Sequence, residues 1–530
     1  MAVDLAFVMV LVAAGVGVAL SVAMERLMVP VPDGSRPLGA WGLHVGLWGL
    51  AYGLMVLLLG RPWFAACAVS AFLLMLVLVN NAKFASLREA FVFQDYEYFT
   101  DAIRHPRLYI PFLGWGKFLG AAAGFVIAIS VGFWGEAVPA QRFSFAGQLG
   151  GILLVVVVGF LLVVLSARQS LPVTFEPNQD VRRLGLLASL WRYAEEELSS
   201  IDADSPFGTI DMETAAKDLP HLVAVQSESF FDPRTLFSGV RADVLAEFDR
   251  LKADSCACGR LKVPAWGANT VRTEFAFLSG VDEFALGVHR FNPYRAVARG
   301  HQWPTLATFL KRLGYRTICI HPYPASFYRR DKVLPRMGFD EFLDIQSFEG
   351  ASRSGPYISD HAVAEKIASI LAEAKQPVFV FAITMENHGP LHLERVESSD
   401  IQSLYSIPPP SGCDDLTVYL RHLKHADEMI GALRKTLEQC ARPAELCWYG
   451  DHVPIMPSVY DRFGEPDGDV EYVFWNNREK VSKRSGMLKR TSYPENGFVR
   501  RGYFLHYECG MNYVVKFKVL MVLGTRPKAV

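Results

Sequence analysis

The stretch His221-Leu-Val-Ala-Val-Gln-Ser-Glu228 is a short apolar run that ends in polar side chains, and it decides the fold expected for the second half of this chain. Strands alternating with helices are typical of a mainly parallel α/β sheet, in which ligands bind beyond the carboxyl ends of the strands. We therefore expect such a sheet, with a site at its carboxyl edge. The same design recurs at 317–320 before His321, at 378–383 before Glu386 and His388, and at 446–449 before Asp451, with helical patterns at 304–312, 360–374 and 415–440.

The first third of the 530 residues is different, because it consists largely of long apolar stretches. About twenty apolar residues in a helix cross the ~30 Å hydrocarbon core of a membrane. The first stretch is too long for a signal-peptide core, so we expect it to be retained. The predicted spans are 5–24, 41–60, 62–79, 109–134 and 149–166.

Five spans place the two ends of the chain on opposite sides of the membrane. The connection 80–108 carries four Lys/Arg residues and four acidic ones, whereas the connections on the other face carry little beyond Arg61 and Arg142. A count of Lys/Arg alone would put 80–108, and with it the soluble half, in the cytoplasm.

Composition sets further limits. The net charge of −1 gives no general affinity for polyanions, so we expect no nucleic-acid partner. The segment 476–530 is basic, with twelve Lys/Arg against three Glu from Arg478 onward; it either solvates a surface or contacts anionic lipid or polymer. Eight cysteines are present, and their pairing cannot be read from spacing.

Three residues that follow the predicted strands are suitable ligands for a divalent metal ion. Glu228 and Asp451 offer carboxylate oxygens, which Mg²⁺ and Mn²⁺ prefer, and His452 adds an imidazole. Gly450 allows the backbone a close approach at that point. Taken alone, a glutamate in the position of Glu228 is more often a surface residue or a helix cap than a metal ligand.

The segment Gly267-Ala-Asn-Thr270-Val-Arg-Thr273-Glu274-Phe opens an apolar-patterned helix. A hydroxyl at a helix N-terminus lies beside free N–H groups that favour phosphate, and a metal ligand of this kind is activated for attack. Thr270 is therefore the expected nucleophile. The alternatives are that Thr270 is only an N-cap, or that Thr273 has this role.

Other polar residues have weaker signals. His388 is suited to donate to a phosphate or to protonate a leaving oxygen, and Arg330 is suited to clamp phosphate. His422 and His425 lie three residues apart on a helix, and without a carboxylate partner in the sequence nearby we interpret them as part of a helix face.

Together these motifs resemble the lipoteichoic acid synthase and phosphoglycerol transferase family, membrane enzymes with a sulfatase-like domain of the alkaline phosphatase superfamily. The segment around Thr270 is similar to the family motif Gly-Gly-x-Thr-x-x-Thr-Glu-Phe, with Ala268 in place of one Gly. The segment Ser-Phe-Tyr-Arg-Arg-Asp at 326–331 is similar to the family segment Ser-Phe-Trp-Asn-Arg-Asp. This chain differs from the family segment at Tyr328, in place of Trp, and at Arg329, in place of Asn.

The resemblance implies roles for individual residues. Thr270 would be the nucleophile and a metal ligand, together with Glu228, Asp451 and His452. It also implies Mn²⁺ or Mg²⁺ as the cofactor. The residues implied to bind the substrate headgroup are Tyr328, Arg330, His388 and His321.

The expected function is transfer of phosphoglycerol from phosphatidylglycerol to an envelope glycan or glycolipid through a phosphothreonine-type intermediate. The family topology implies a multi-pass protein of the bacterial inner membrane with a periplasmic catalytic domain, against the Lys/Arg count. The alternatives are phosphoethanolamine transfer, hydrolysis of a phospho- or sulfoester, and a non-catalytic scaffold. The expected domains are a transmembrane domain at 1–168, linker helices at 169–219, a catalytic domain at 220–475 and a basic tail at 476–530.

Overall fold

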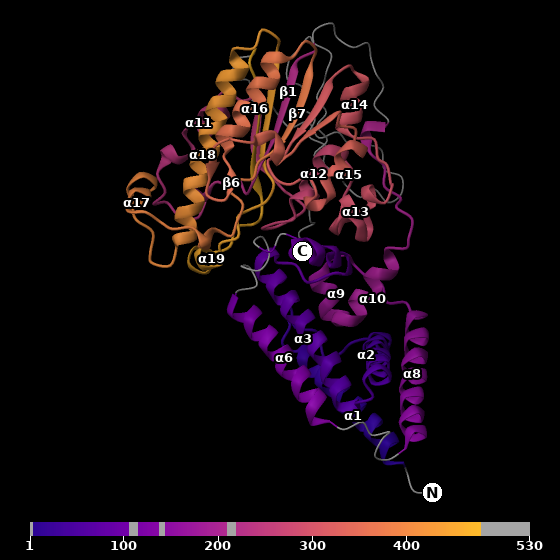
Figure 1. Ribbon diagram of the computed structural model, residues 1–530. Coiled ribbons are helices and arrows are strands. Elements are labelled where there is room, and N and C mark those ends of the chain that lie inside the picture. Colours follow the sequence, from indigo (N-terminus) through magenta and orange to yellow (C-terminus); the bar gives the residue numbers. More distant parts are fainter. Residues whose placement is uncertain (1–3, 105, 107–114, 137–143, 209–218, 479–530) are drawn as a thin grey trace, which may run out of the picture. The chain divides into compact units, whose positions relative to one another are not determined.

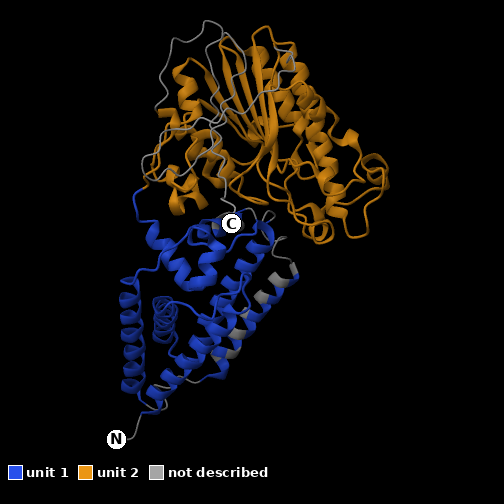
Figure 2. Cartoon of the chain, turned by 180° about the vertical axis from the view of Figure 1, so that it is seen from behind, with its two compact units in different colours: residues 1–200 blue, residues 201–530 orange. Residues whose placement is uncertain are grey.

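The first 200 residues form a helical unit, and residues 201–530 form a second unit built around a β-sheet (Figure 2). The computed structural model describes residues 4–104, 106, 115–136, 144–208 and 219–478. The basic tail lies outside the described residues from 479 onward. Each unit is described by itself.

The helical unit contains both long apolar helices and shorter ones (Figure 1). Within the described residues, α1, α2, α3 and α8 are long and apolar enough to cross a membrane. The helix α6 covers most of the predicted span 109–134, whose residues 109–114 lie outside the description. The helices are α1 Leu5–Glu25, α2 Leu38–Leu59, α3 Pro62–Leu87, α4 Tyr98–Arg104, α6 Trp115–Gly135, α8 Phe145–Ala167, α9 Pro177–Leu184 and α10 Leu186–Glu196.

Small residues let α2 and α8 pack closely. A Cβ atom at Gly46 would lie 2.8 Å from the carbonyl oxygen of Gly159, and a Cβ at Gly42 would lie 2.0 Å from the hydroxyl of Ser166. Glycines spaced four apart on one helix face permit such backbone contact between membrane helices. The glycine pattern of α2 therefore fixes the packing of this pair.

The second unit is an α/β fold. Within the described residues its main sheet has seven strands in the order β2-β9-β8-β1-β7-β3-β4. The neighbours β8, β1, β7, β3 and β4 are parallel, whereas β9 is antiparallel to both β8 and β2. The strands are β1 His221–Ser227, β2 Ala257–Leu261, β3 Arg316–Ile320, β4 Glu341–Leu343, β7 Val378–Ile383, β8 Ala444–Gly450 and β9 Val470–Asn476, and β5 Arg353–Ser354 pairs separately with β6 Tyr357–Ile358.

Helices cover both faces of the sheet, as Figure 1 shows. Successive residues of a strand point to opposite faces, so Leu222 and Ala224 of β1 join one core, whereas Val223 and Val225 join the other. The helices α12 to α15 lie on the first face, and α11, α16 and α18 lie on the second. The helices are α11 Ala246–Ala253, α12 Thr270–Ser279, α13 Pro293–Ala298, α14 Leu306–Arg312, α15 Arg330–Arg336, α16 Asp360–Glu373, α17 Ser398–Leu404, α18 Asp414–Glu438 and α19 Pro457–Phe463.

The predicted mainly parallel α/β sheet is confirmed, and the four predicted strands correspond to β1, β3, β7 and β8. The sequence did not predict β2 and β9, which extend the sheet beyond β8, or β4, which extends it beyond β3. Three of the five residues of β2 are exposed, so its sequence lacks the apolar run of a buried strand.

Candidate active site

The pairing of β1 with β8 determines which residues meet at the carboxyl edge of the sheet. Ser227 is paired with Gly450 in parallel register, so Glu228 and Asp451 follow side by side. A Cβ atom at residue 450 would lie 2.2 Å from the carbonyl oxygen of Phe230, and only glycine fits there. The predicted close approach at Gly450 is thus present.

Glu228, Asp451 and His452 are buried together, with one potential ligand atom of each within 4.8 Å of the others. His452 Nε2 lies 3.6 Å from Glu228 Oε1 and 3.3 Å from Asp451 Oδ2. The second oxygen, Asp451 Oδ2, has no hydrogen-bond partner among the described residues. A buried carboxylate oxygen without a donor is costly unless a cation binds it, so this group fits a divalent metal.

Hydrogen bonds hold each of these side chains in place. The backbone N–H groups of Ser229 and His452 donate to Asp451 Oδ1 over 2.8 and 2.9 Å, and the Ser229 hydroxyl donates to Glu228 Oε1 over 2.9 Å. His452 Nδ1 lies 3.1 Å from the carbonyl oxygen of Val453. That contact assigns the proton to Nδ1 and leaves the Nε2 lone pair facing the two carboxylates, as metal ligation requires.

Burial and the neighbouring negative charge of Asp451 raise the pKa of Glu228 to about 8. His452, Ser229 and Arg330 act in the opposite direction without cancelling the effect. In the absence of a cation, Glu228 therefore holds a proton at neutral pH, and a metal ion must displace that proton.

Thr270 is the first residue of α12, and the N-cap position belongs to Asn269, whose side chain makes no capping hydrogen bond. The alternative that Thr270 is only an N-cap is therefore wrong. The hydroxyl of Thr273 donates to the backbone oxygen of Asp451 over 2.9 Å, which anchors α12 against the ligand loop. The hydroxyl of Thr273 therefore has a structural role, because it is used in this hydrogen bond.

Arg330 is fully buried and paired with Glu274, a residue to which the sequence assigned no role. Its Nε donates to Glu274 Oε2 over 3.1 Å, a second guanidinium nitrogen contacts Oε1, and the Tyr294 hydroxyl donates to Oε2 over 2.6 Å. Although burial opposes charge on Arg330, Glu274 raises its pKa and keeps it cationic. The positive charge of Arg330 reaches both Glu228 and His388, where it lowers the pKa of each side chain.

The two predicted substrate histidines have different surroundings. His321 is buried, with Nδ1 3.2 Å from the carbonyl oxygen of Ile383 and Nε2 3.2 Å from Arg330. Burial and the charge of Arg330 hold the pKa of His321 well below its usual value, so it is neutral. His388 is half-buried, and burial lowers its pKa although Asp451 acts in the opposite direction.

Positive backbone φ angles in the second unit flank the predicted site. Within its described residues, the non-glycine residues in this conformation are Ser229, Asn269, Tyr328 and Arg329. Each adjoins or belongs to the segments that hold Glu228, Thr270 and Arg330. Such strain costs of order 1–3 kcal/mol per residue and gathers at functional sites.

The interpretation of His422 and His425 as an ordinary helix face is wrong. Both imidazoles contact Glu386, which lies after β7, and His422 also contacts Glu394. The carboxylates lie 28 to 39 residues away in the sequence. Local spacing could not reveal them, because the fold brings β7 and α18 together.

The comparisons with known proteins agree with this fold. Residues 220–492 match the family described as Sulfatase, and this match covers more than half of the chain. The chain therefore belongs to the sulfatase family, as its motifs predicted.

The chain is also similar to several individual proteins. The capsular polysaccharide biosynthesis protein RkpI of Rhizobium meliloti is 29% identical over 440 residues, 77% of each chain. A putative cyclic beta-1,2-glucan modification protein of the same organism is 26% identical over 56% of this chain and 48% of its own length. The Streptococcus pyogenes phosphoglycerol transferase GacH, solved with sn-glycerol-1-phosphate, is 24% identical with a TM-score of 0.43, covering 51% of this chain and 72% of its own.

The raised pKa of Glu228 predicts how metal binding depends on pH. Because one proton must leave Glu228 for each ion bound, Mn²⁺ affinity should rise about tenfold per pH unit up to about pH 8. Since the pKa is 4.5 in the unfolded chain and about 8 in the folded one, the ion-free protein should lose stability as pH rises between these values. Calorimetric titration at pH 6, 7 and 8 measures the affinity, and a Glu228→Gln variant should lose this pH dependence. An affinity independent of pH in the wild type would contradict the assignment.

The buried pair predicts a large cost for neutralising Glu274. In Glu274→Gln the buried guanidinium of Arg330 loses its counter-charge, and we expect destabilisation of about 3–5 kcal/mol. Thermal denaturation of the purified protein measures the effect. The matched control is Glu341→Gln, which removes a partner of Arg316 in a pair whose side chains are each 39% exposed; it should cost at most about 1 kcal/mol. Equal effects of the two variants would refute a structural role for Glu274.

Proposed function

We propose that this protein transfers a phosphoglycerol headgroup from phosphatidylglycerol to an envelope glycan through a covalent intermediate on Thr270. The observation that carries the proposal is the convergence of Glu228, Asp451 and His452 next to the helix that begins with Thr270. The sequence motif around Thr270 supports the same reaction, because it resembles the nucleophile motif of phosphoglycerol transferases.

The four residues Glu228, Thr270, Asp451 and His452 would hold Mn²⁺ or Mg²⁺, which when bound neutralises phosphoryl charge and favours an ionised hydroxyl. In the first step the neutral His388 takes the proton of the Thr270 hydroxyl, the Thr270 oxygen forms a bond to phosphorus, and the bond from phosphorus to the diacylglycerol oxygen breaks. His388 gives that leaving oxygen the same proton. In the second step an acceptor hydroxyl attacks the same phosphorus and its proton passes to His388. The bond from phosphorus to the Thr270 oxygen breaks, and His388 returns a proton to that oxygen.

Other residues hold and select the headgroup. Arg330, kept cationic by Glu274, adds positive potential near the site. Tyr328 is half-buried, and the Arg330 guanidinium lies 5.2 Å from the centre of its ring. The side chain of Arg329 is exposed beside them and repels a cationic headgroup. This charge favours glycerophosphate over phosphoethanolamine as the transferred group.

The acceptor is proposed from the relatives. One is named for capsular polysaccharide biosynthesis and another for modification of a cyclic glucan. Both names refer to glycans, whose sugar hydroxyls are chemically suitable acceptors for a phosphoryl group. A phospholipid donor and an envelope acceptor are accessible together at the outer face of the inner membrane, so we place the second unit in the periplasm.

The nucleophile is tested by intact mass of the purified protein after incubation with phosphatidylglycerol and Mn²⁺, with no acceptor present. We expect one glycerophosphoryl group on the peptide that contains Thr270, and Thr270→Ala should lose the adduct and at least about 10³-fold of the transfer rate. Thr235→Ala, at an exposed threonine, is the control and should behave as wild type. An adduct from phosphatidylethanolamine instead would change the donor, and release of free headgroup with no adduct would indicate hydrolysis.

The proposed side of the membrane is tested at Cys258, a free and exposed cysteine of β2. A membrane-impermeant maleimide should label it in intact cells with a permeabilised outer membrane, and Cys258→Ser should lower that labelling. Labelling that requires lysis of the inner membrane would place the unit in the cytoplasm, as the Lys/Arg count predicts.

A further inference from the structure

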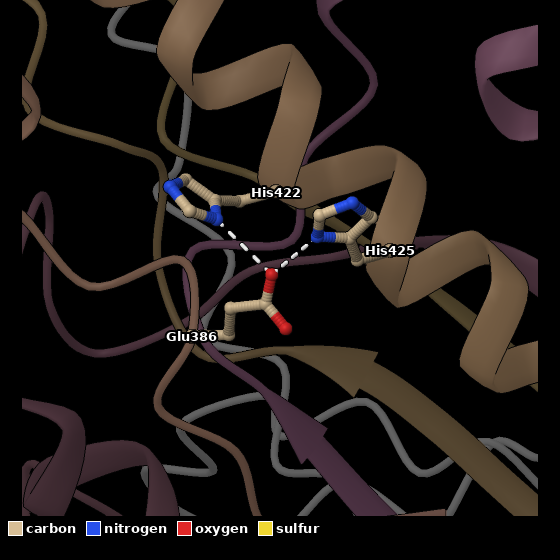
Figure 3. A group of neighbouring side chains, drawn as sticks. All are labelled: Glu386, His422 and His425. Atoms are coloured by element: carbon tan, nitrogen blue, oxygen red, sulfur yellow. Dashed lines mark hydrogen bonds and ion pairs between the residues drawn. The ribbon is translucent and has the colours of Figure 1, made fainter. Parts of the chain in front are cut away.

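A second group of metal-ligating side chains lies outside the site described above. Glu386 follows β7, and His422 and His425 project from neighbouring turns of α18 toward it (Figure 3). Glu386 Oε1 lies 3.1 Å from His422 Nδ1 and 2.5 Å from His425 Nδ1. The three ligand atoms lie within 4.8 Å of one another. Two imidazole nitrogens therefore face one carboxylate oxygen.

Further contacts orient these side chains. The backbone N–H of Asp360 donates to Glu386 Oε2 over 2.7 Å, which turns Oε1 toward the histidines. His422 Nε2 lies 3.1 and 3.2 Å from the two carboxylate oxygens of Glu394. A carboxylate that accepts the outer N–H of an imidazole fixes its tautomer and leaves the inner nitrogen free to bind a metal.

The competing interpretation is an ion-free hydrogen-bonded cluster. It requires His422 to carry protons on both nitrogens, and hydrogen bonds to Glu386 and Glu394 do outweigh burial and raise the pKa of His422 to about 9. It leaves Asp360 unexplained, however. This carboxylate is 1% exposed, adjoins Glu386 through its own N–H, and has no hydrogen-bond partner for either oxygen among the described residues. Two buried oxygens without a hydrogen-bond partner beside Glu386 are costly, and a cation in the cluster would reduce that cost.

We propose that Glu386, His422 and His425 bind a second divalent transition-metal ion, separate from the one at Glu228. Two imidazoles and one carboxylate are a ligand set for Zn²⁺ and neighbouring transition metals. Tetrahedral Zn²⁺ with bonds of about 2.0–2.1 Å separates its ligand atoms by about 3.3 Å. The 3.1 Å pair already fits, and the 2.5 Å pair must open by less than about 1 Å.

The location suggests what this ion does. Glu386 lies two residues before His388, in the segment that follows β7, and β7 is the neighbour of β1 in the sheet. In the same segment, the hydroxyl of Thr384 accepts a hydrogen bond from the Glu228 N–H over 3.0 Å. An ion bound to Glu386 would tie the segment that carries His388 to α18. The second site thus goes beyond the proposed transfer reaction and does not depend on it.

The test is the metal content of the purified full-length protein in detergent, stripped with a chelator, reloaded with Zn²⁺ and desalted. We expect two ions per chain in the wild type and one in His425→Ala, a change at a side chain that is 39% exposed. The matched control is His361→Ala, at a histidine of α16 that is 70% exposed, and it should retain two ions. Asp451→Asn should also retain one ion, which separates the two sites.

A second readout uses Co²⁺, whose visible absorption reports imidazole ligands. His425→Ala should lose the part of the spectrum that Asp451→Asn retains. Glu394→Gln keeps all three ligands and should weaken Zn²⁺ binding at this site about 10–100-fold. One ion in the wild type, unaffected by His425→Ala and lost in Asp451→Asn, would overturn the second site alone. One ion lost in His425→Ala and unaffected by Asp451→Asn would support it and count against the proposed active site.

Discussion

The parallel register of β1 and β8 is the constraint on which the candidate active site depends. It places two carboxylates, Glu228 and Asp451, next to each other at the end of a buried pair of strands. Two negative charges at such a short distance repel each other strongly in the low-dielectric interior. The fold therefore needs either a proton on one carboxylate or a cation between the two. Gly450 makes this approach possible, because any side chain at that position would meet the backbone of Phe230.

This constraint explains why the surrounding backbone is strained and densely hydrogen-bonded. Ser229, with a positive φ, uses its N–H on Asp451 and its hydroxyl on Glu228. Asn269, also at positive φ, is the N-cap of α12, and the hydroxyl of Thr273 in that helix donates to the backbone oxygen of Asp451. These strained conformations and their hydrogen bonds hold the ligand side chains in position before any ion binds. Catalysis by charge stabilisation depends on such preorganisation.

The sequence predicted the elements whose signals are local. Apolar runs that end in polar residues identified β1, β3, β7 and β8, and the motif around Thr270 identified the start of α12. It missed contacts made only by the fold. Glu274 lies within the motif around Thr270, but its partner Arg330 is 56 residues away at the start of α15, so only the fold brings the two side chains together. His422 and His425 have no visible partner in the sequence, because their carboxylate, Glu386, comes from the segment that follows β7.

The buried pair of Glu274 and Arg330 also limits how Arg330 takes part in the reaction. Its Nε and one terminal nitrogen are used by Glu274, and the other terminal nitrogen faces His321. A guanidinium held in this way cannot swing out to clamp a phosphate with two new bonds without leaving Glu274 uncompensated in the interior. Its contribution is therefore mainly a fixed positive potential. In the proposed reaction, direct contact with the phosphoryl oxygens would then fall to the half-buried His388 and to backbone N–H groups at the start of α12.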